Sequence, residues 1–109
     1  MLKEFLLGFV KLHIVYHASR EPVFGLELIR ELSRHGYKLS PGTLYPILHN
    51  LEQTGYLKRE KRVVEGKVRK YYKTTPQGKR ALKEARAKIA ELVSEVLKDQ
   101  GSKSLRRIS

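Results

Sequence analysis

Residues 40–55 read SPGTLYPILHNLEQTG, and this stretch decides the fold because it describes a short helix with clear ends. Ser40 followed by Pro41 is typical of a helix start, since serine caps the first backbone amides and proline suits the first helical position. Gly55 stands where a left-handed residue would end the helix. Between them, apolar side chains recur at the spacing of one helix face: Leu44, Ile47, Leu48 and Leu51.

Two more helices are predicted upstream of this stretch. The first covers about Leu2 to Ala18 and carries apolar residues on more than one face, so it needs more than one packing partner. The second covers about Phe24 to His35, and Gly36 stands at the position of a left-handed C-terminal cap. A turn of only three residues, 37–39, then leads into the capped helix, which is the spacing of a helix-turn-helix.

A basic β-hairpin is predicted directly downstream. The runs Tyr56–Val64 and Val68–Thr74 are rich in β-branched and aromatic residues and are joined at Glu65-Gly66-Lys67, a glycine-containing turn. This hairpin carries eight Lys and Arg side chains, so at least one of its faces must lie in solvent or on a ligand. Thr75-Pro76 repeats the cap-plus-proline start, and it predicts a fourth helix that ends at about Lys98.

The charge of the chain indicates an anionic partner. Twenty-three Lys and Arg residues against eleven Asp and Glu residues leave a formal charge of +12. Residues 40–75 hold eight basic and three acidic side chains and four of the six tyrosines. Because such an excess attracts a polyphosphate backbone, we expect double-stranded DNA as the partner.

Other classes of function are excluded by what the sequence lacks. There is no cysteine, which removes disulfide scaffolds, thiolate zinc sites and cysteine nucleophiles. No glycine-rich phosphate loop, Gly-x-Ser-x-Gly motif or pair of acids in an apolar setting is present, so we expect neither an enzyme nor a cofactor. The apolar run Phe5–Val10 is too short to span a bilayer and lacks a cleavage site, so we expect a cytoplasmic protein without a membrane partner.

The order of elements predicts a mostly α chain with a small β-hairpin, which is a winged helix-turn-helix. The length of 109 residues fits one domain with a short appendage. We assign residues 1–75 to a DNA-binding winged helix-turn-helix domain and residues 76–98 to a C-terminal dimerisation helix. Residues 99–109, which lack periodicity, are expected to form a mobile basic tail.

Several motifs make the chain resemble the PadR family of transcriptional regulators. They are Leu44-Tyr45-Pro46-Ile47-Leu48, Leu51-Glu52, Gly55-Tyr56-Leu57, Arg69-Lys70-Tyr71-Tyr72, and Thr75 with Gly78. The resemblance covers residues 2–98 and implies a winged-helix homodimer that represses transcription from a palindromic operator. In some members a small-molecule effector releases the operator. The chain departs from the family pattern at Thr74-Thr75, where Leu-Thr is usual, and it has no tryptophan. Because similar drug-binding members stack flat ligands on a tryptophan, an aromatic drug site is not expected.

The expected DNA contacts lie on the capped helix and on the hairpin. Tyr45 has an alternative role, which is packing against the first helix. Along the second strand, alternation places Tyr72 with Lys70 and Tyr71 on the opposite side, so one tyrosine belongs to the core, and we place Tyr71 towards DNA. The predicted contact residues are Ser40, Gly42, Thr43, Tyr45, His49, Lys67, Arg69, Lys70 and Tyr71.

An apolar seam on the fourth helix predicts a homodimer. Its residues step by 3, 4, 3 and 4 from Leu82 to Val96, which is the spacing of two coiled-coil heptads. The same stripe could pack on the winged domain of its own chain instead. The first helix favours the dimer, because it has more apolar surface than a small core can bury. The predicted interface residues are Phe5, Phe9, Leu82, Ala85, Ile89, Leu92, Val93 and Val96.

Two other hypotheses stay open. A structural RNA-binding or ribosome-associated winged helix would also need strong positive charge, and it would be monomeric. His13 and His17 are four residues apart on the first helix, a spacing that can chelate a metal ion. Glu21 is the nearest further ligand in sequence, so we expect a buried or interface pair and no metal. A metal-responsive regulator that uses these two histidines is the third hypothesis.

Overall fold

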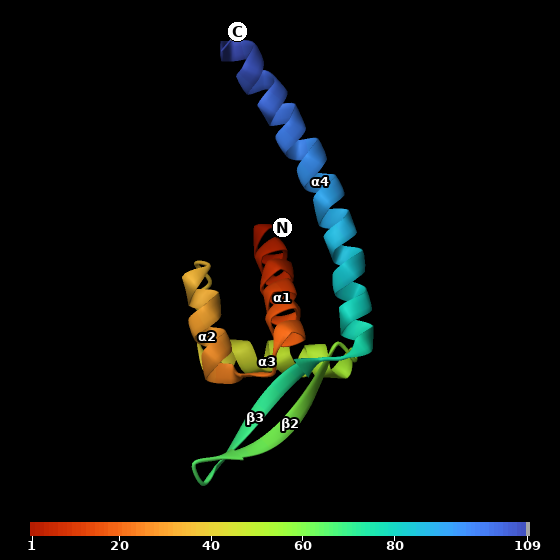
Figure 1. The fold of residues 1–109 in the computed structure, drawn as a ribbon. Coiled ribbons are helices and arrows are strands. Elements are labelled where there is room, and N and C mark those ends of the chain that lie inside the picture. The colour runs from red at the N-terminus through yellow and green to blue at the C-terminus, as the bar shows by residue number, and fades with distance from the viewer. Residues whose placement is uncertain (109) are drawn as a thin grey trace.

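The computed structural model describes residues 1–108, with side chains described for residues 1–98. Helices dominate, and the strands form one small sheet (Figure 1). The predicted winged helix-turn-helix is therefore confirmed. In chain order the elements are α1 (Leu2–Arg20), β1 (Val23–Phe24), α2 (Gly25–Arg34), α3 (Pro41–Gln53), β2 (Leu57–Val64), β3 (Lys67–Thr74) and α4 (Pro76–Ile108).

The ends of α2 and α3 follow the local sequence signals. The Ser40 side chain accepts a hydrogen bond from the backbone N–H of Thr43 at 3.3 Å, and Pro41 is the first residue of α3. Gly36 and Gly55 have φ angles of +86° and +85°, the left-handed conformation that closes a helix. These signals lie within a few residues of each helix end, which is why the sequence predicts them.

The sheet has a strand that the sequence does not predict. Its order is β1-β3-β2 with antiparallel pairing, and β1 pairs Val23 with Tyr72 and Phe24 with Tyr71. The prediction that Phe24 belongs to the second helix is wrong, because its backbone is extended with φ −105° and ψ 162°. A strand of two residues is too short to show a period of alternation, so sequence patterning does not find it.

The β2–β3 hairpin closes at Glu65 and Gly66. Both residues have positive φ angles, 51° and 76°, which is the two-residue turn that matches the twist of antiparallel strands. Lys67, predicted as part of the turn, is the first residue of β3.

The core lies where α1, α2, α3 and the base of the hairpin meet. Thr74 is buried there, and its hydroxyl donates a hydrogen bond to the backbone carbonyl of Val15 at 2.7 Å, which fastens β3 to α1. A satisfied buried hydroxyl of this kind avoids the cost of desolvating an unpaired polar group. The buried apolar residues are Val10, Ile14, Val15, Ala18, Val23, Leu28, Leu32, Leu44, Leu48, Leu51, Leu57 and Tyr72.

Helix α4 is longer than the sequence predicts. It begins after Thr75, whose hydroxyl accepts a hydrogen bond from the N–H of Gly78 at 3.0 Å, and it continues to Ile108 rather than ending near Lys98. The prediction that regular structure stops there is wrong, because Gly101 costs a helix only about 1 kcal/mol relative to alanine. The last residue, 109, lies outside the described residues, and the mobility predicted for residues 99–109 stays a prediction.

The length of α4 gives the molecule its elongated shape. The helix projects well past the N-terminal end of α1 (Figure 1), and the molecule measures 64 × 27 × 25 Å. Within the part of the chain that the structure describes, no helix is long and apolar enough to traverse a bilayer.

Candidate nucleic-acid interface

The solvent-facing side of α3 carries the contacts predicted for this helix. Ser40, Gly42, Thr43 and His49 are all exposed, while Leu44, Leu48 and Leu51 anchor the opposite side in the core. A Cβ added at Gly42 would meet just the Ser40 Oγ, at 3.8 Å. Gly42 therefore leaves the first turn of α3 open to close approach by a ligand.

Tyr45 links α3 to the start of α2. Its side chain is 47% exposed, and its hydroxyl lies so close to Gly25 that a Cβ there would approach the oxygen to 2.5 Å. Packing against the first helix was the alternative expectation, and the hydroxyl lies against α2 instead. The exposed part of the ring remains available to a ligand at the surface.

The hairpin places like charges directly opposite one another. Lys58 pairs with Lys73, Lys61 with Lys70, and Arg62 with Arg69 in the register of β2 and β3. Facing like charges destabilise a strand pair. Among residues 1–98, the ion pairs on the hairpin are those of Arg59 with Glu52 at 3.6 Å and of Arg62 with Glu60 at 3.2 Å. A polyanion laid along the hairpin would relieve the remaining repulsion.

The two adjacent tyrosines of β3 have different surroundings. Tyr72 is 3% exposed, and burial raises the pKa of its phenol, with the Glu52 carboxylate adding to the effect. Tyr71 lies half-buried on the other face, edge-on to Phe24 with ring centroids 5.6 Å apart, and the Arg62 guanidinium lies 4.9 Å from its ring centroid. The prediction that one tyrosine belongs to the core is confirmed, and Tyr72 is that residue.

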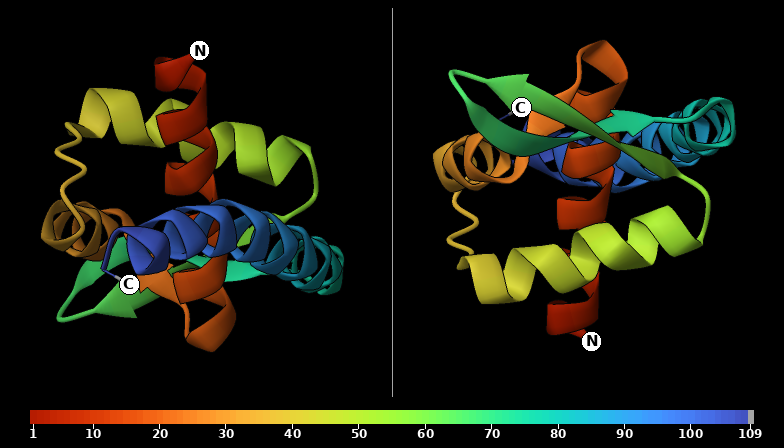
Figure 2. Two further views of the ribbon diagram at one scale, coloured as in Figure 1. Left: turned by 90° about the horizontal axis from the view of Figure 1, so that it is seen from above. Right: turned by 90° about the horizontal axis from the view of Figure 1, so that it is seen from below.

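A recess joins α3 to the hairpin. It has a volume of about 350 Å³ and is lined by Phe24, Gly25, Tyr45, Val68, Arg69 and Lys70. The Arg69 guanidinium lies 4.9 Å from the centroid of the Phe24 ring, which holds this cation at the edge of the recess. Both α3 and the hairpin lie at the end of the molecule away from the C-terminus of α4 (Figure 1), and seen from below they run along opposite edges of this end (Figure 2, right). The structure thus brings together Tyr45, Arg69 and Lys70, while His49 and Lys67 are exposed outside the recess.

Most of the residues predicted for dimerisation form exposed apolar surface in the single chain. Phe5 and Phe9 on α1 are 51% and 42% exposed. Leu82 and Ala85 differ, because they are half-buried and Leu82 packs against the core of its own chain. Further along α4, the exposed apolar residues are Ile89, Leu92, Val93, Val96 and Leu97.

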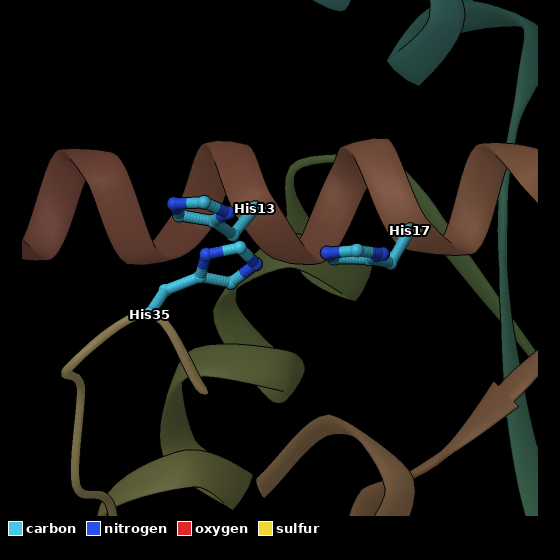
Figure 3. Close-up of side chains that lie close together, drawn as sticks. All are labelled: His13, His17 and His35. Carbon is cyan, nitrogen blue, oxygen red and sulfur yellow. The ribbon is translucent and has the colours of Figure 1, made fainter. Parts of the chain in front are cut away.

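A cluster of three histidines and one glutamate lies apart from this basic surface, and the sequence indicates only its pair His13 and His17. His13 and His17 of α1 meet His35, the residue that follows α2 (Figure 3). Glu31 within α2 lies beside His17 and His35. Burial lowers the pKa of His13, and the imidazoles of His35 and His17 lower it further. Glu31 and His35 are four residues apart, a spacing that marks a shared helix face. Their approach to α1 depends on helix packing, which no local motif reports.

A winged helix-turn-helix with a basic hairpin directly after its second helix, here α3, is the architecture of a DNA-binding transcriptional regulator. The transcriptional regulator PadR-like family matches residues 14–84, and the chain belongs to this family. The resemblance seen in the sequence is therefore confirmed. Membership identifies the chain as a DNA-binding regulator of transcription and not an enzyme.

Individual relatives agree with this assignment. The chain is 52% identical over 99 residues to the transcriptional regulator Rv3488 of Mycobacterium tuberculosis, covering 91% of this chain and 92% of the relative. A PadR family transcriptional regulator from Eggerthella lenta is 36% identical with a TM-score of 0.75, covering 90% of this chain and 87% of that one. A PadR-like transcriptional regulator from Bacillus cereus has a TM-score of 0.80 at 29% identity, covering 87% and 94%.

Proposed function

We propose that the chain acts as a homodimeric repressor that binds a palindromic operator, with α3 in the major groove and the β2–β3 hairpin on the adjacent backbone or minor groove. An α-helix with its side chains is about 10–12 Å wide and fits a major groove about 12 Å wide. Release by a small-molecule effector is part of the same proposal and rests on the resemblance to the family.

The observation that carries the proposal is the recess shared by α3 and β3. Tyr45 on one wall and Arg69 and Lys70 on the other can contact a single duplex at once, because they line one concavity. Lys and Arg side chains of the β2–β3 hairpin would position the protein by neutralising phosphates, whereas residues on the exposed side of α3 would contact the edges of the bases. The facing like charges of the hairpin favour the bound state, since phosphates offset their repulsion.

Dimerisation is supported by the apolar surface that one chain leaves uncovered. The first half of α1 and the middle of α4, from Ile89 to Leu97, expose large apolar side chains on the same elongated molecule, and α4 projects beyond the body that would otherwise cover it. A two-fold pair would place two copies of α3 about 34 Å apart, which matches half-sites one turn of DNA apart.

Selection of bound fragments from genomic DNA tests the operator. We expect one inverted-repeat sequence to be enriched, and we expect log affinity to fall linearly with log salt. Equal affinity for every duplex, or preference for folded RNA, would contradict the proposal.

A variant pair then tests the hairpin. Lys70→Ala should weaken binding to the selected operator and to unrelated duplexes alike, and reduce the salt slope by about one per protomer. Lys83→Ala, an exposed lysine on α4, is the matched control and should leave affinity and slope unchanged. Equal effects of the two substitutions would mean that net charge, and not the hairpin, determines binding.

A further inference from the structure

Three of the four histidines of the chain gather between α1 and α2. His13 and His17 lie one turn apart on the same face of α1, and His35 reaches toward them from the end of α2 (Figure 3). Each residue offers one ring nitrogen, and these three atoms all lie within 4.8 Å of one another. The fourth histidine, His49, is exposed on α3.

The Glu31 carboxylate lies beside two of these histidines, and its Oε2 atom also pairs with the Arg34 guanidinium at 3.3 Å. The Glu31 Oε1 atom lies 3.7 Å from the His17 Nε2 and 3.6 Å from the His35 Nε2. Three imidazole nitrogens and one carboxylate oxygen are ligands that zinc accepts in a four-coordinate site. Because Zn–N distances are about 2.0–2.1 Å, ligand atoms in a tetrahedral site are about 3.4 Å apart. The histidine nitrogens lie within 4.8 Å of one another, so side-chain rotation must bring the ligand atoms together to this spacing when the ion binds.

Ring stacking is the competing explanation for the cluster. The His13 and His35 rings are nearly parallel with centroids 4.5 Å apart, and the His13 and His17 centroids are 6.2 Å apart. Stacking accounts for the ring planes of a pair. Stacking alone does not explain why the Glu31 carboxylate lies beside the nitrogens of two of the rings, where a shared cation would take it as a fourth ligand.

The cluster is reachable from solvent. It forms the polar end of a groove of about 500 Å³ between α1, α2 and α4, and the other walls include Phe9, Leu82 and Ile89. The His35 side chain is 42% exposed and the His17 side chain 21% exposed. An ion can thus enter without unfolding of either helix, and apolar walls limit competition from water.

We propose that His13, His17, His35 and Glu31 form a binding site for one divalent transition-metal ion of the zinc class. Nitrogen-rich ligand sets of this kind favour Zn²⁺, Ni²⁺, Co²⁺ or Cu²⁺ over Mg²⁺ and Ca²⁺, which prefer oxygen ligands. The ion would join α1 to α2, the helix that precedes α3. The site does not depend on the proposed DNA contacts, because its ligands lie outside the DNA-binding surface, whereas Phe9, Leu82 and Ile89 beside it belong to the proposed dimer interface.

Calorimetric titration of the untagged full chain with ZnCl₂, in the absence of DNA, tests the site. We expect one Zn²⁺ per chain and no competition from excess Mg²⁺. His35→Ala should weaken the Zn²⁺ affinity at least about tenfold. Loss of a residue that only hydrogen-bonds to a metal ligand already lowers metal affinity about 10–100-fold, and His35 is proposed as a ligand itself. His49→Ala removes a histidine outside the cluster and should bind Zn²⁺ as the wild type does. A wild-type chain that shows no saturable binding, or equal affinities of the two variants, would overturn the proposal.

Substitution with Co²⁺ supplies a second readout that structural damage alone does not mimic. A four-coordinate Co²⁺ ion should give an intense visible absorption in the wild type and in His49→Ala. Glu31→Gln, which preserves side-chain shape, should shift or weaken this absorption while the metal-free circular dichroism spectrum stays unchanged. An absorption that is the same in the wild type and in Glu31→Gln would remove Glu31 from the site.

Discussion

Gly78 shows how one residue sets the position of a whole helix. It is buried in the first turn of α4, and a Cβ there would overlap the backbone oxygen of Tyr56 and the Thr74 methyl group. The start of α4 can therefore lie against the base of the hairpin only because this side chain is absent. Gly42 differs, since a Cβ there would make only an ordinary van der Waals contact with the Ser40 Oγ at 3.8 Å.

We expect Gly78→Ala to lower the free energy of unfolding by about 1–3 kcal/mol, because the backbone of the hairpin must move to admit the methyl group. Gly42→Ala is the control and should leave stability unchanged or slightly raised, since alanine is the better helix former. Urea denaturation followed by circular dichroism measures both. Equal losses in the two variants would show that the close contact at Tyr56 does not determine the stability.

The sequence predicts the role of a residue where that role depends on neighbours in the chain. The Ser40 cap and the division between Tyr71 and Tyr72 follow from local hydrogen bonding and from alternation along a strand. The contact of Tyr45 with Gly25, and the meeting of His35 with the histidines of α1, arise from packing of separate helices. No pattern within one helix contains that information.

At the scale of the element, the hairpin combines weak intrinsic stability with a binding surface. The facing cations of β2 and β3 repel each other in the free protein, and the exposed pair Val63 and Val68 near the turn adds little buried area. Its strands were predictable from composition and from the Gly66 turn. The third strand, β1, was not, because its two residues are extended only through pairing with β3.

We expect Lys61→Glu to affect stability and binding in opposite directions. The new carboxylate faces Lys70, so the free energy of unfolding should rise by about 0.2–1 kcal/mol at low salt, and operator affinity should fall. Lys83→Glu makes the same change of charge on α4 and should weaken operator binding much less. Thermal unfolding and fluorescence anisotropy at two salt concentrations provide the measurements. Operator affinity that is equal in the two variants would contradict a role for the hairpin in binding.

At the scale of the whole molecule, the apolar surface is divided between a core and an exposed band. The second half of α1 fills the core with Val10 and Ile14, while its first half exposes Phe5 and Phe9. Sequence periodicity predicted both surfaces because each recurs along one helix. Periodicity did not show that Leu82 packs on its own chain while Ile89 is exposed. That difference depends on where α4 stops touching the other helices, which its length and curvature determine.

We expect Ile89→Asp to convert the proposed dimer into a monomer, because a charge without a partner at the centre of an apolar seam is costly to bury. Ala87→Asp introduces the same charge at an exposed position that the heptad pattern places outside the seam, and it should remain dimeric. Sedimentation equilibrium at micromolar concentration distinguishes the two. Because a dimer holds both half-sites at once, Ile89→Asp should bind the full operator about 100-fold or more weakly, while its affinity for an isolated half-site stays that of the wild-type protomer. A dimer that persists in Ile89→Asp would show that α4 reaches its partner through another face.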